Sequence, residues 1–178
     1  MTQAATKQAL PRASRVLKAG TWDSSREAGS VTLAFADRHR RRIVLAMDQG
    51  GKVLLDLERA AMLRDGDGLE IDGNGLELED GSVLRVIAAP EPCIDLTCDA
   101  CDGPDALLRL AWHIGNRHAP VMVVDGRTLR IQADPVLLDM ARGQGAEAVQ
   151  VHAPFQPEGG AYEVEYRPHA YQEGGHVH

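Results

Sequence analysis

Six of the seven histidines lie in the second half of the chain, together with all of its excess negative charge. Residues 1–89 hold 13 Lys or Arg and 13 Asp or Glu, whereas residues 90–178 hold 6 and 13, so the whole net charge of −7 belongs to residues 90–178. Imidazole and carboxylate groups together suit divalent metal ions. The six histidines are His113, His118, His152, His169, His176 and His178. We therefore expect the chemistry in the second half and a plain scaffold in the first.

The most distinctive segment is Trp-His-Ile-Gly-Asn-Arg-His-Ala-Pro, residues 112–120. Gly115 and Asn116 are predicted to end a helix in left-handed geometry, and Pro120 prevents the helix from resuming. His118 then lies on a short connector near the surface, with its ring free. His113 precedes it by five residues, about 140° around a helix, so the two should not share one site. We interpret His113 as a packed or capping residue. For His118, the residues themselves leave a binding role and a plain surface role open.

Three cysteines are too few, and an odd number, for a disulfide framework, and they suit a reducing compartment such as the cytoplasm. Cys98 and Cys101 form a Cys-x-x-Cys pair close to Cys93, but the second pair of a structural zinc site is missing. We interpret them as inert thiols, with a redox or auxiliary metal role as the alternative.

Composition and missing motifs exclude several classes of protein. A net charge of −7 argues against a general nucleic-acid binder, and no apolar run approaches the roughly 20 residues of a membrane span. Phosphate-loop, dinucleotide-binding, zinc-protease and nucleophile-elbow motifs are absent, so we expect a protein that is not an enzyme. The basic run at residues 38–42 is interpreted as a solvated hairpin turn, with contact to an acidic partner as the lesser alternative.

The elements that must position these residues divide near Pro90 into two domains. After a flexible N-terminus (1–14), short runs rich in β-branched and aliphatic residues predict a small all-β domain over residues 15–89. These runs are 31–35, 42–47, 53–57, 69–71, 76–78 and 82–89. Ala89-Pro-Glu-Pro92 is predicted to be a stiff linker, because proline fixes φ and disfavours a helix before it.

Residues 90–153 predict a second domain with the order β-α-β-β-α-β, which is the ferredoxin-like arrangement. The predicted strands are 93–97, 121–124, 128–132 and 146–152, and the predicted helices are 104–114, with Asp102 as N-cap, and 134–142, with Asp134 as N-cap and Pro135 following. Glycines, prolines and polar residues after Pro154 indicate a flexible tail (154–178) that carries histidines. The predicted fold class is α+β.

At this point the residues resemble those of a known family. His-Ile-Gly-Asn-Arg-His at 113–118 resembles the Tyr-His-Leu-Gly-Asn-Arg-His signature of the urease accessory protein UreE family, with Trp112 in place of the tyrosine. Leu63-Arg-Asp-Gly-Asp67 is similar to the Leu-x-Asp-Gly-Asp turn of that family, and residues 86–91 are similar to its interdomain segment. Residues 154–162 resemble its Phe-x-Pro-Glu-Gly-Gly-Ala-Tyr ending.

This resemblance implies a homodimeric nickel metallochaperone with an N-terminal β domain that contacts partners and a ferredoxin-like metal-binding domain. It implies that His118 is the interfacial nickel ligand, one from each subunit, and that Ni(II) passes to the urease apoprotein complex through the accessory GTPase. His152 is a weaker match to a further ligand, and the tail histidines His169, His176 and His178 complete the shell.

The tail offers fewer histidines than the dense runs that end many members of the family, so storage of several ions per chain is not expected. The runner-up hypothesis is a general zinc or copper buffer that uses the same site without a urease client. A metal-dependent hydrolase is disfavoured, because no base accompanies His118.

Overall fold

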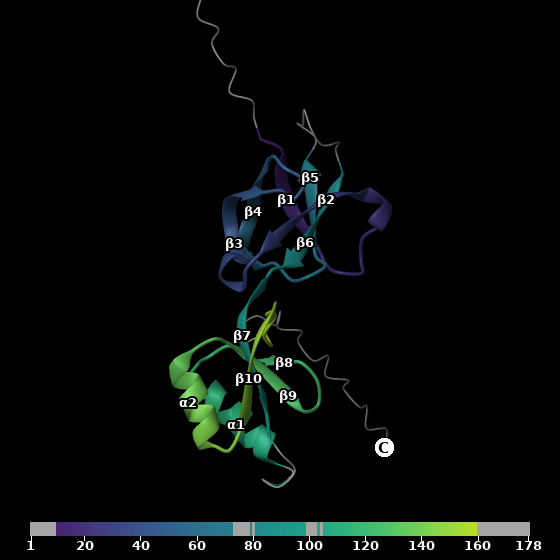
Figure 1. Ribbon diagram of the computed structural model, residues 1–178. Helices are drawn as coiled ribbons and strands as arrows, with labels where there is room; N and C mark the ends of the chain where they lie inside the picture. The colour runs from purple at the N-terminus through teal and green to yellow at the C-terminus, as the bar shows by residue number, and fades with distance from the viewer. Residues whose placement is uncertain (1–9, 73–78, 80, 99–102, 104, 160–178) are drawn as a thin grey trace, which may run out of the picture.

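In the computed structural model, which describes residues 10–72, 79, 81–98, 103 and 105–159, the chain forms two domains joined by strand β7 (Pro90–Thr97). The domains lie end to end (Figure 1). The first is β-rich and the second mixes helices and strands, which confirms the predicted two-domain α+β architecture at that level. No helix within the described ranges has the length and apolar character needed to cross a bilayer.

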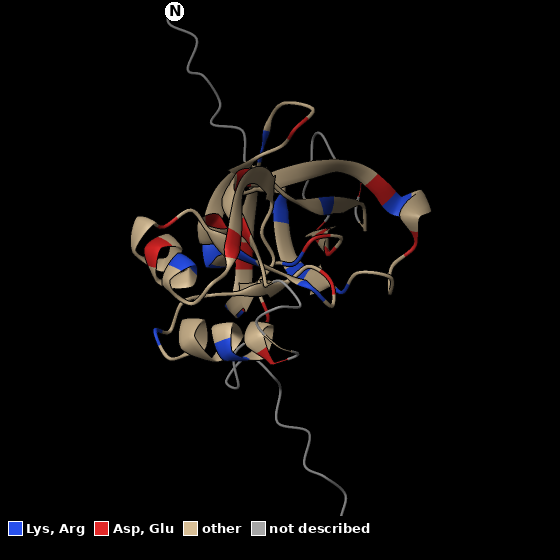
Figure 2. Cartoon of the chain, turned by 60° about the horizontal axis from the view of Figure 1, so that its bottom comes forward, with Lys and Arg blue, Asp and Glu red and all other residues tan. Residues whose placement is uncertain are grey.

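The N-terminal domain is a six-stranded sheet with the order β2-β6-β5-β1-β4-β3. Its strands are β1 (Arg12–Leu17), β2 (Glu27–Leu33), β3 (His39–Ala46), β4 (Lys52–Met62), β5 (Gly68–Asp72) and β6 (Val83–Ala88). Alternating side chains form the core, including Val31, Leu55 and Ile71, each at most 1% exposed. Acidic and basic residues are interspersed over the domain (Figure 2), as its balanced composition predicts.

Strand β1 corrects the expected N-terminal boundary, because it begins at Arg12, inside the stretch 1–14 that was expected to be flexible. Ala13 is fully buried, and β1 pairs parallel with β4 and antiparallel with β5, so it is an inner strand of the sheet. The predicted strand at 76–78 and the predicted N-cap Asp102 lie outside the described residues.

The second domain places two helices on an antiparallel sheet with the order β10-β7-β9-β8. Its elements after β7 are α1 (Ala106–Gly115), β8 (Met122–Val123), β9 (Thr128–Gln132), α2 (Pro135–Gly143) and β10 (Glu147–Pro154). Helix α2 begins as the sequence predicts, with the Asp134 side chain accepting a hydrogen bond from Leu137 N at 2.9 Å and Pro135 in the first turn. Both helices and the sheet share one apolar core around Leu96, Leu110 and Ile131.

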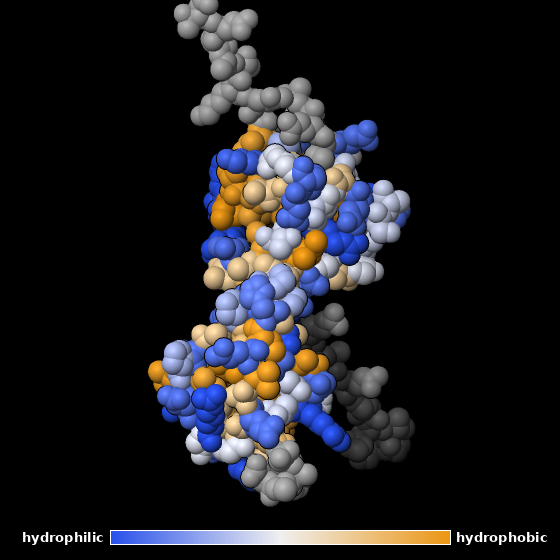
Figure 3. All heavy atoms as spheres, in the orientation of Figure 1, coloured by the Kyte–Doolittle hydropathy of each residue, from blue (hydrophilic) through white to orange (hydrophobic). Residues whose placement is uncertain are grey.

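The predicted stiff linker is wrong as a separate segment, because Pro90 and Pro92 already belong to β7. They pair with Pro154 and His152 of β10, and an extended strand accommodates the fixed φ of proline. The space-filling view shows a narrower waist between the two lobes at this level (Figure 3). The flexible tail predicted from residue 154 also starts too early, since Phe155 is fully buried.

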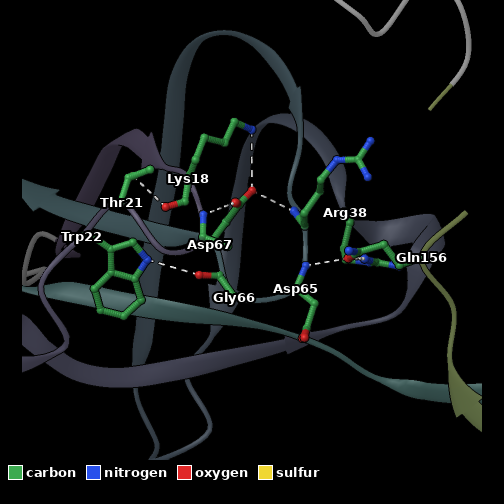
Figure 4. A network of polar contacts seen from close by, with 10 residues as sticks. Lys18, Thr21, Trp22, Arg38, Asp65, Gly66, Asp67 and Gln156 are labelled. Atoms are coloured by element: carbon green, nitrogen blue, oxygen red, sulfur yellow. Dashed lines mark hydrogen bonds and ion pairs between the residues drawn. The ribbon is translucent and has the colours of Figure 1, made fainter. Parts of the chain in front are cut away.

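The turn that precedes β5 is held by two carboxylates with different partners (Figure 4). Asp67 is 1% exposed, and its side chain accepts hydrogen bonds from Ala19 N at 3.0 Å and from Arg64 N at 2.9 Å. The Asp65 side chain accepts a hydrogen bond from Ala88 N at 2.8 Å. Gly66 has φ +81°, a conformation that disfavours side chains, which explains the Asp-Gly-Asp spacing. The turn therefore ties β6 and the loop after β1 together.

Replacing Asp67 with alanine should lower the free energy of unfolding by about 2–3 kcal/mol, because the backbone N–H groups of Ala19 and Arg64 lose a buried, charged acceptor. Urea denaturation of the metal-free protein measures this. Asp105→Ala is the matched control, since Asp105 is exposed and caps α1 without a side-chain hydrogen bond. It should stay within about 0.5 kcal/mol of wild type. Equal losses for the two variants would contradict the role assigned to Asp67.

Candidate metal site and interdomain pocket

His118 lies on the connector between α1 and β8, with its side chain exposed, as the sequence predicts. Helix α1 continues into a turn in which Arg117 N donates to Ile114 O at 3.0 Å and His118 N donates to Gly115 O at 2.9 Å. The left-handed residue of this turn is His118 itself, with φ +54°. The expectation that Gly115 and Asn116 would adopt this geometry is wrong, since Asn116 has φ −65°.

Among the described residues, His118 is the only one other than glycine with a positive φ. This region costs free energy for most side chains, although Asn, Asp and His enter it more readily than others. A glycine would satisfy the turn at lower cost. An imidazole at such a position therefore suggests a use for the ring that is separate from folding.

Helix α1 buries one face and exposes large apolar side chains on another. Leu110 and Ile114 are at most 1% exposed, whereas Leu108 is 68% and Trp112 63% exposed. Leu108 and Trp112 are four residues apart, so they lie on the same face of the helix. The His113 ring packs edge-on against Trp112 with centroids 4.9 Å apart, consistent with the packed role predicted for it.

Arg38 differs from the interpretation of residues 38–42 as a solvated turn, because it is 1% exposed. Its Nη2 donates to Phe155 O and its Nη1 donates to Gln156 Oε1 at 3.2 Å, so a side chain of the first domain binds the segment after β10. Gln156 Oε1 also accepts from Asp65 N at 2.7 Å (Figure 4). The Arg38 guanidinium lies 5.5 Å from the Phe35 ring centroid.

The same junction contains a contact between two aromatic rings and a half-buried carboxylate. Phe35 and Phe155 meet edge to face with centroids 5.2 Å apart. Glu91 accepts hydrogen bonds from Phe35 N at 2.9 Å and from Gln132 Nε2 at 2.7 Å. These contacts span the domain boundary and fix how the connector with His118 lies relative to the first domain.

A pocket of about 340 Å³ opens between the domains beside this junction. It is lined by three segments that are distant in sequence. The first domain contributes Phe35, Arg38, Met62 and Arg64, the connector contributes residues 118–121, and the segment after β10 contributes residues 156–158. His118 is therefore at once a surface histidine and a wall of the interdomain pocket.

The other predicted ligands are not brought to His118 in the described structure. His152 is exposed on β10 opposite Pro92 and does not line the pocket. His169, His176, His178 and Cys101 lie outside the described residues. In the ranges that the structure describes, no group of three His, Cys, Asp or Glu side chains is arranged to hold a metal ion.

The described cysteines offer little as ligands. Cys93 is buried, and burial raises the pKa of its thiol, which disfavours the thiolate that metals bind. Its thiol group contacts Ala153 O at 3.7 Å across the β7–β10 pair. Cys98 is half-buried.

Arg38 and Gln156 are the residues that sequence reasoning missed. Arg38 stands at the head of a run of basic residues, and such runs are usually solvated. The only local signal is Phe35, three residues earlier, whose ring lies beside the guanidinium once the short turn Phe35–Asp37 forms.

Two family models match the chain, and they describe the two domains of a urease accessory protein. The N-terminal domain of UreE urease accessory protein matches residues 12–89, and the C-terminal domain matches residues 91–178. The boundary between the two matches falls at Pro90, where β7 begins. Together they cover most of the chain.

Curated relatives agree with the models. Urease accessory protein UreE of Rhodopseudomonas palustris (strain HaA2) is 46% identical over 151 residues, and that of Bradyrhizobium sp. (strain ORS 278) is 45% identical over 151 residues; each alignment covers 85% of this chain. The chain spans 65% and 66% of the length of these two relatives. The protein of the same name from Beijerinckia indica subsp. indica is 44% identical over 153 residues, and the alignment covers 85% of this chain and 80% of that protein. The chain belongs to the UreE family of urease accessory proteins, which are accessory chaperones and not catalytic enzymes.

The left-handed turn at His118 predicts an unusual response to glycine. His118→Gly should leave the free energy of unfolding of the metal-free protein within about 0.5 kcal/mol of wild type, because relief at positive φ offsets the added chain entropy. His118→Val should lose about 1–2 kcal/mol. Arg117→Gly is the control at the neighbouring position, where φ is not positive, and should cost about 0.5–1 kcal/mol. If glycine destabilises position 118 as much as position 117, the backbone does not set the preference.

Proposed function

We propose that the protein is a nickel metallochaperone that binds Ni(II) and delivers it for assembly of the urease active site. Membership of the UreE family supports a role in urease maturation. The single observation that carries the proposal further is the exposed imidazole of His118, held in a left-handed turn. Imidazole is a borderline ligand that suits nickel, copper and zinc, so geometry and supply choose among these ions.

The working form in this proposal is a homodimer in which His118 of each subunit contributes one ligand to a shared ion. One imidazole per chain holds a metal weakly, but a two-fold axis brings two together in a self-complementary interface. The exposed Leu108 and Trp112 on α1 support such an interface, because burying each is worth about 1.5–3 kcal/mol. Few charges interrupt this face, since Arg109 is the sole Lys, Arg, Asp or Glu within α1 (Figure 2).

We assign the second domain to the ferredoxin-like fold, which the observed element order and the antiparallel strand order β10-β7-β9-β8 support. The partners in this proposal are the accessory GTPase and the urease apoprotein complex, with the N-terminal domain providing a contact surface. A cytoplasmic location is part of the proposal, because a chain with three cysteines and a free thiol at Cys93 suits a reducing compartment.

Further ligands in the proposed site come from His152 and from the tail histidines His169, His176 and His178. Ligands on a tether can join and leave the ion, and this gives the lability that delivery requires. The cysteines are not assigned to the primary site, because the raised pKa of Cys93 opposes thiolate formation.

Calorimetric nickel titration of the full chain, with sedimentation to measure its oligomeric state, tests this assignment. The strongest site should bind about half an equivalent per chain, since one ion is shared by two subunits. His118→Asn should remove that step, because asparagine keeps the left-handed turn and lacks the imidazole. His113→Asn and Cys98→Ser are the matched controls, and both should retain the step.

Nickel delivery is measured as the activation of urease apoprotein when the nickel-loaded protein is the only source of metal. Wild type should activate, and His118→Asn should not. A strong site of one full equivalent per chain that survives His118→Asn would overturn the assignment. Tight binding without activation would favour the general zinc or copper buffer.

A further inference from the structure

Strand β3 forms a free edge of the N-terminal sheet. It is the last strand in the order β2-β6-β5-β1-β4-β3, and among the described strands it pairs only with β4 (Figure 1). After an irregularity between Arg40 and Arg42, the antiparallel register runs without a break from Arg42, opposite Asp56, to Ala46, opposite Lys52. An edge strand leaves alternate backbone groups without a partner in the sheet. Residues 42–46 therefore offer a regular stretch to which a further strand can be added.

The hydrogen-bond alternation identifies the open backbone groups. At the end of the β3–β4 hairpin, Met47 N donates to Gly51 O at 3.2 Å. In an antiparallel pair, residues that bond to the neighbouring strand alternate with residues whose N–H and C=O groups point away from it. Counting back from Met47, the residues that point away from β4 are Arg42, Val44 and Ala46. No other described segment makes a backbone hydrogen bond to them.

The same edge carries positive charge that is incompletely neutralised. Strand β3 contains three arginines and no carboxylate. Arg40 forms an ion pair with Asp37 at 2.8 Å, and Arg42 shares Asp56, at 3.7 Å, with a second arginine. Arg41 is exposed and has no ion pair or hydrogen bond with any residue that the structure describes. Two half-neutralised cations and one free cation thus lie beside the open backbone groups.

An apolar contact surface lies next to these charges. Val44 is 47% exposed and is directly opposite the half-buried Leu54 of β4. Alternate residues of a strand share a face of the sheet, so Val44 lies on the same face as Arg42. A segment paired with β3 can therefore cover Val44 with an apolar side chain and place acidic side chains near the arginines on either side.

The charges decide between the possible occupants of this edge. Pairing β3 with β3 of a second copy would bring six arginines, three from each strand, into one ribbon in which neither strand has a carboxylate. Charged residues on edge strands commonly prevent such self-association. An acidic extended segment meets the opposite condition, because each of its carboxylates faces a cation. Nucleic acid is disfavoured by the net charge of −7 on the chain.

We infer that the β3 edge is a docking site for an extended acidic segment of a protein partner, which adds to the sheet as a further strand. Its backbone bonds to Arg42, Val44 and Ala46, one apolar side chain covers Val44, and its carboxylates lie beside Arg41 and Arg42. This inference deepens the proposed function, since it names the surface by which the N-terminal domain contacts a partner. Its test uses the metal-free protein, so its failure leaves the nickel site untouched.

The position of β3 relates this docking site to the proposed metal site. Strand β3 begins at His39, which is opposite Met62 of β4. Met62 lines the interdomain pocket together with His118. A partner bound along β3 therefore extends toward the connector that carries His118.

Titration of the metal-free full chain with the end-blocked peptide Ser-Glu-Val-Glu-Val-Glu-Ser, followed by amide chemical shifts, tests the inference. We expect saturable shifts along residues 42–46, with a dissociation constant of roughly 0.1–1 mM, because the segment is short. The matched ligands are the same peptide with N-methylated backbone amides and the same peptide with lysine in place of glutamate. Each should bind at least roughly tenfold more weakly, since each lacks either the backbone donors or the negative charge.

Three variants locate the site. Val44→Pro removes an outward N–H at an edge position that accepts proline, so it should fold and weaken binding by at least roughly tenfold. Arg41→Glu reverses the free charge and should weaken binding roughly fivefold. Arg127→Glu is the charge-matched control in the exposed turn before β9 and should bind as wild type. If Val44→Pro does not fold, Arg41→Glu and the N-methylated peptide decide the question.

Several results would overturn the inference. Without a saturable shift along β3, or with wild-type affinity in both Val44→Pro and Arg41→Glu, the edge is not the docking site. Equal binding of the N-methylated peptide would show charge attraction without strand addition. Tighter binding of a DNA duplex, weakened by Arg41→Glu, would show a polyanion site. Self-association in sedimentation that Val44→Pro abolishes would show that a second copy occupies the edge.

Discussion

The burial of Arg38 between the two domains is the constraint on which the rest of the arrangement depends. Removing a guanidinium from water costs several kcal/mol, so the junction must return hydrogen bonds and close packing around it. The Phe155 carbonyl and the Gln156 amide oxygen accept its N–H groups, and the Phe35 ring lies beside it. Because these acceptors follow β10, the end of the second domain is held against the first.

The Asp65–Asp67 turn extends this constraint into both domains. Gln156 Oε1 accepts from Arg38 and from Asp65 N, while the Asp65 carboxylate accepts from Ala88 N at the end of β6. The strand leading out of the first domain and the segment returning from the second are thus bound to one turn. For function, this means that the connector that carries His118 faces the first domain across the pocket that both line.

The sequence predicts correctly those elements that are determined by residues close to one another in the chain. Helix α2 begins at Pro135 after the cap Asp134, and β9 occupies Thr128–Gln132, both as expected. Helix capping and the alternation of apolar and polar residues each depend on only a few neighbouring residues. The exposed position of His118 is likewise predicted from residues close to it, namely the end of the helix and Pro120. The resemblance in residues 113–118 then identified the family, which periodicity and composition could not do.

The predictions that are wrong concern residues whose environment is set by contacts with segments distant in sequence. Arg38 looks like its basic neighbours, and only the docking of Phe155 and Gln156 makes it a buried residue. Pro90 and Pro92 read as a linker until β10 pairs with them, and β1 was overlooked because its burial depends on strands β4 and β5. The left-handed residue was placed two positions early, since helical hydrogen bonding continues through Asn116 and Arg117.

The central claim is that His118 is the residue on which a shared metal ion is assembled. A crystal structure of the nickel-loaded protein, with anomalous scattering recorded at the nickel edge, tests it directly. We predict one peak on a two-fold axis, between the imidazoles of two His118 residues and about 2.1 Å from each ligating nitrogen. A peak at Cys93 or Cys98, or one held within a single chain away from His118, would contradict it.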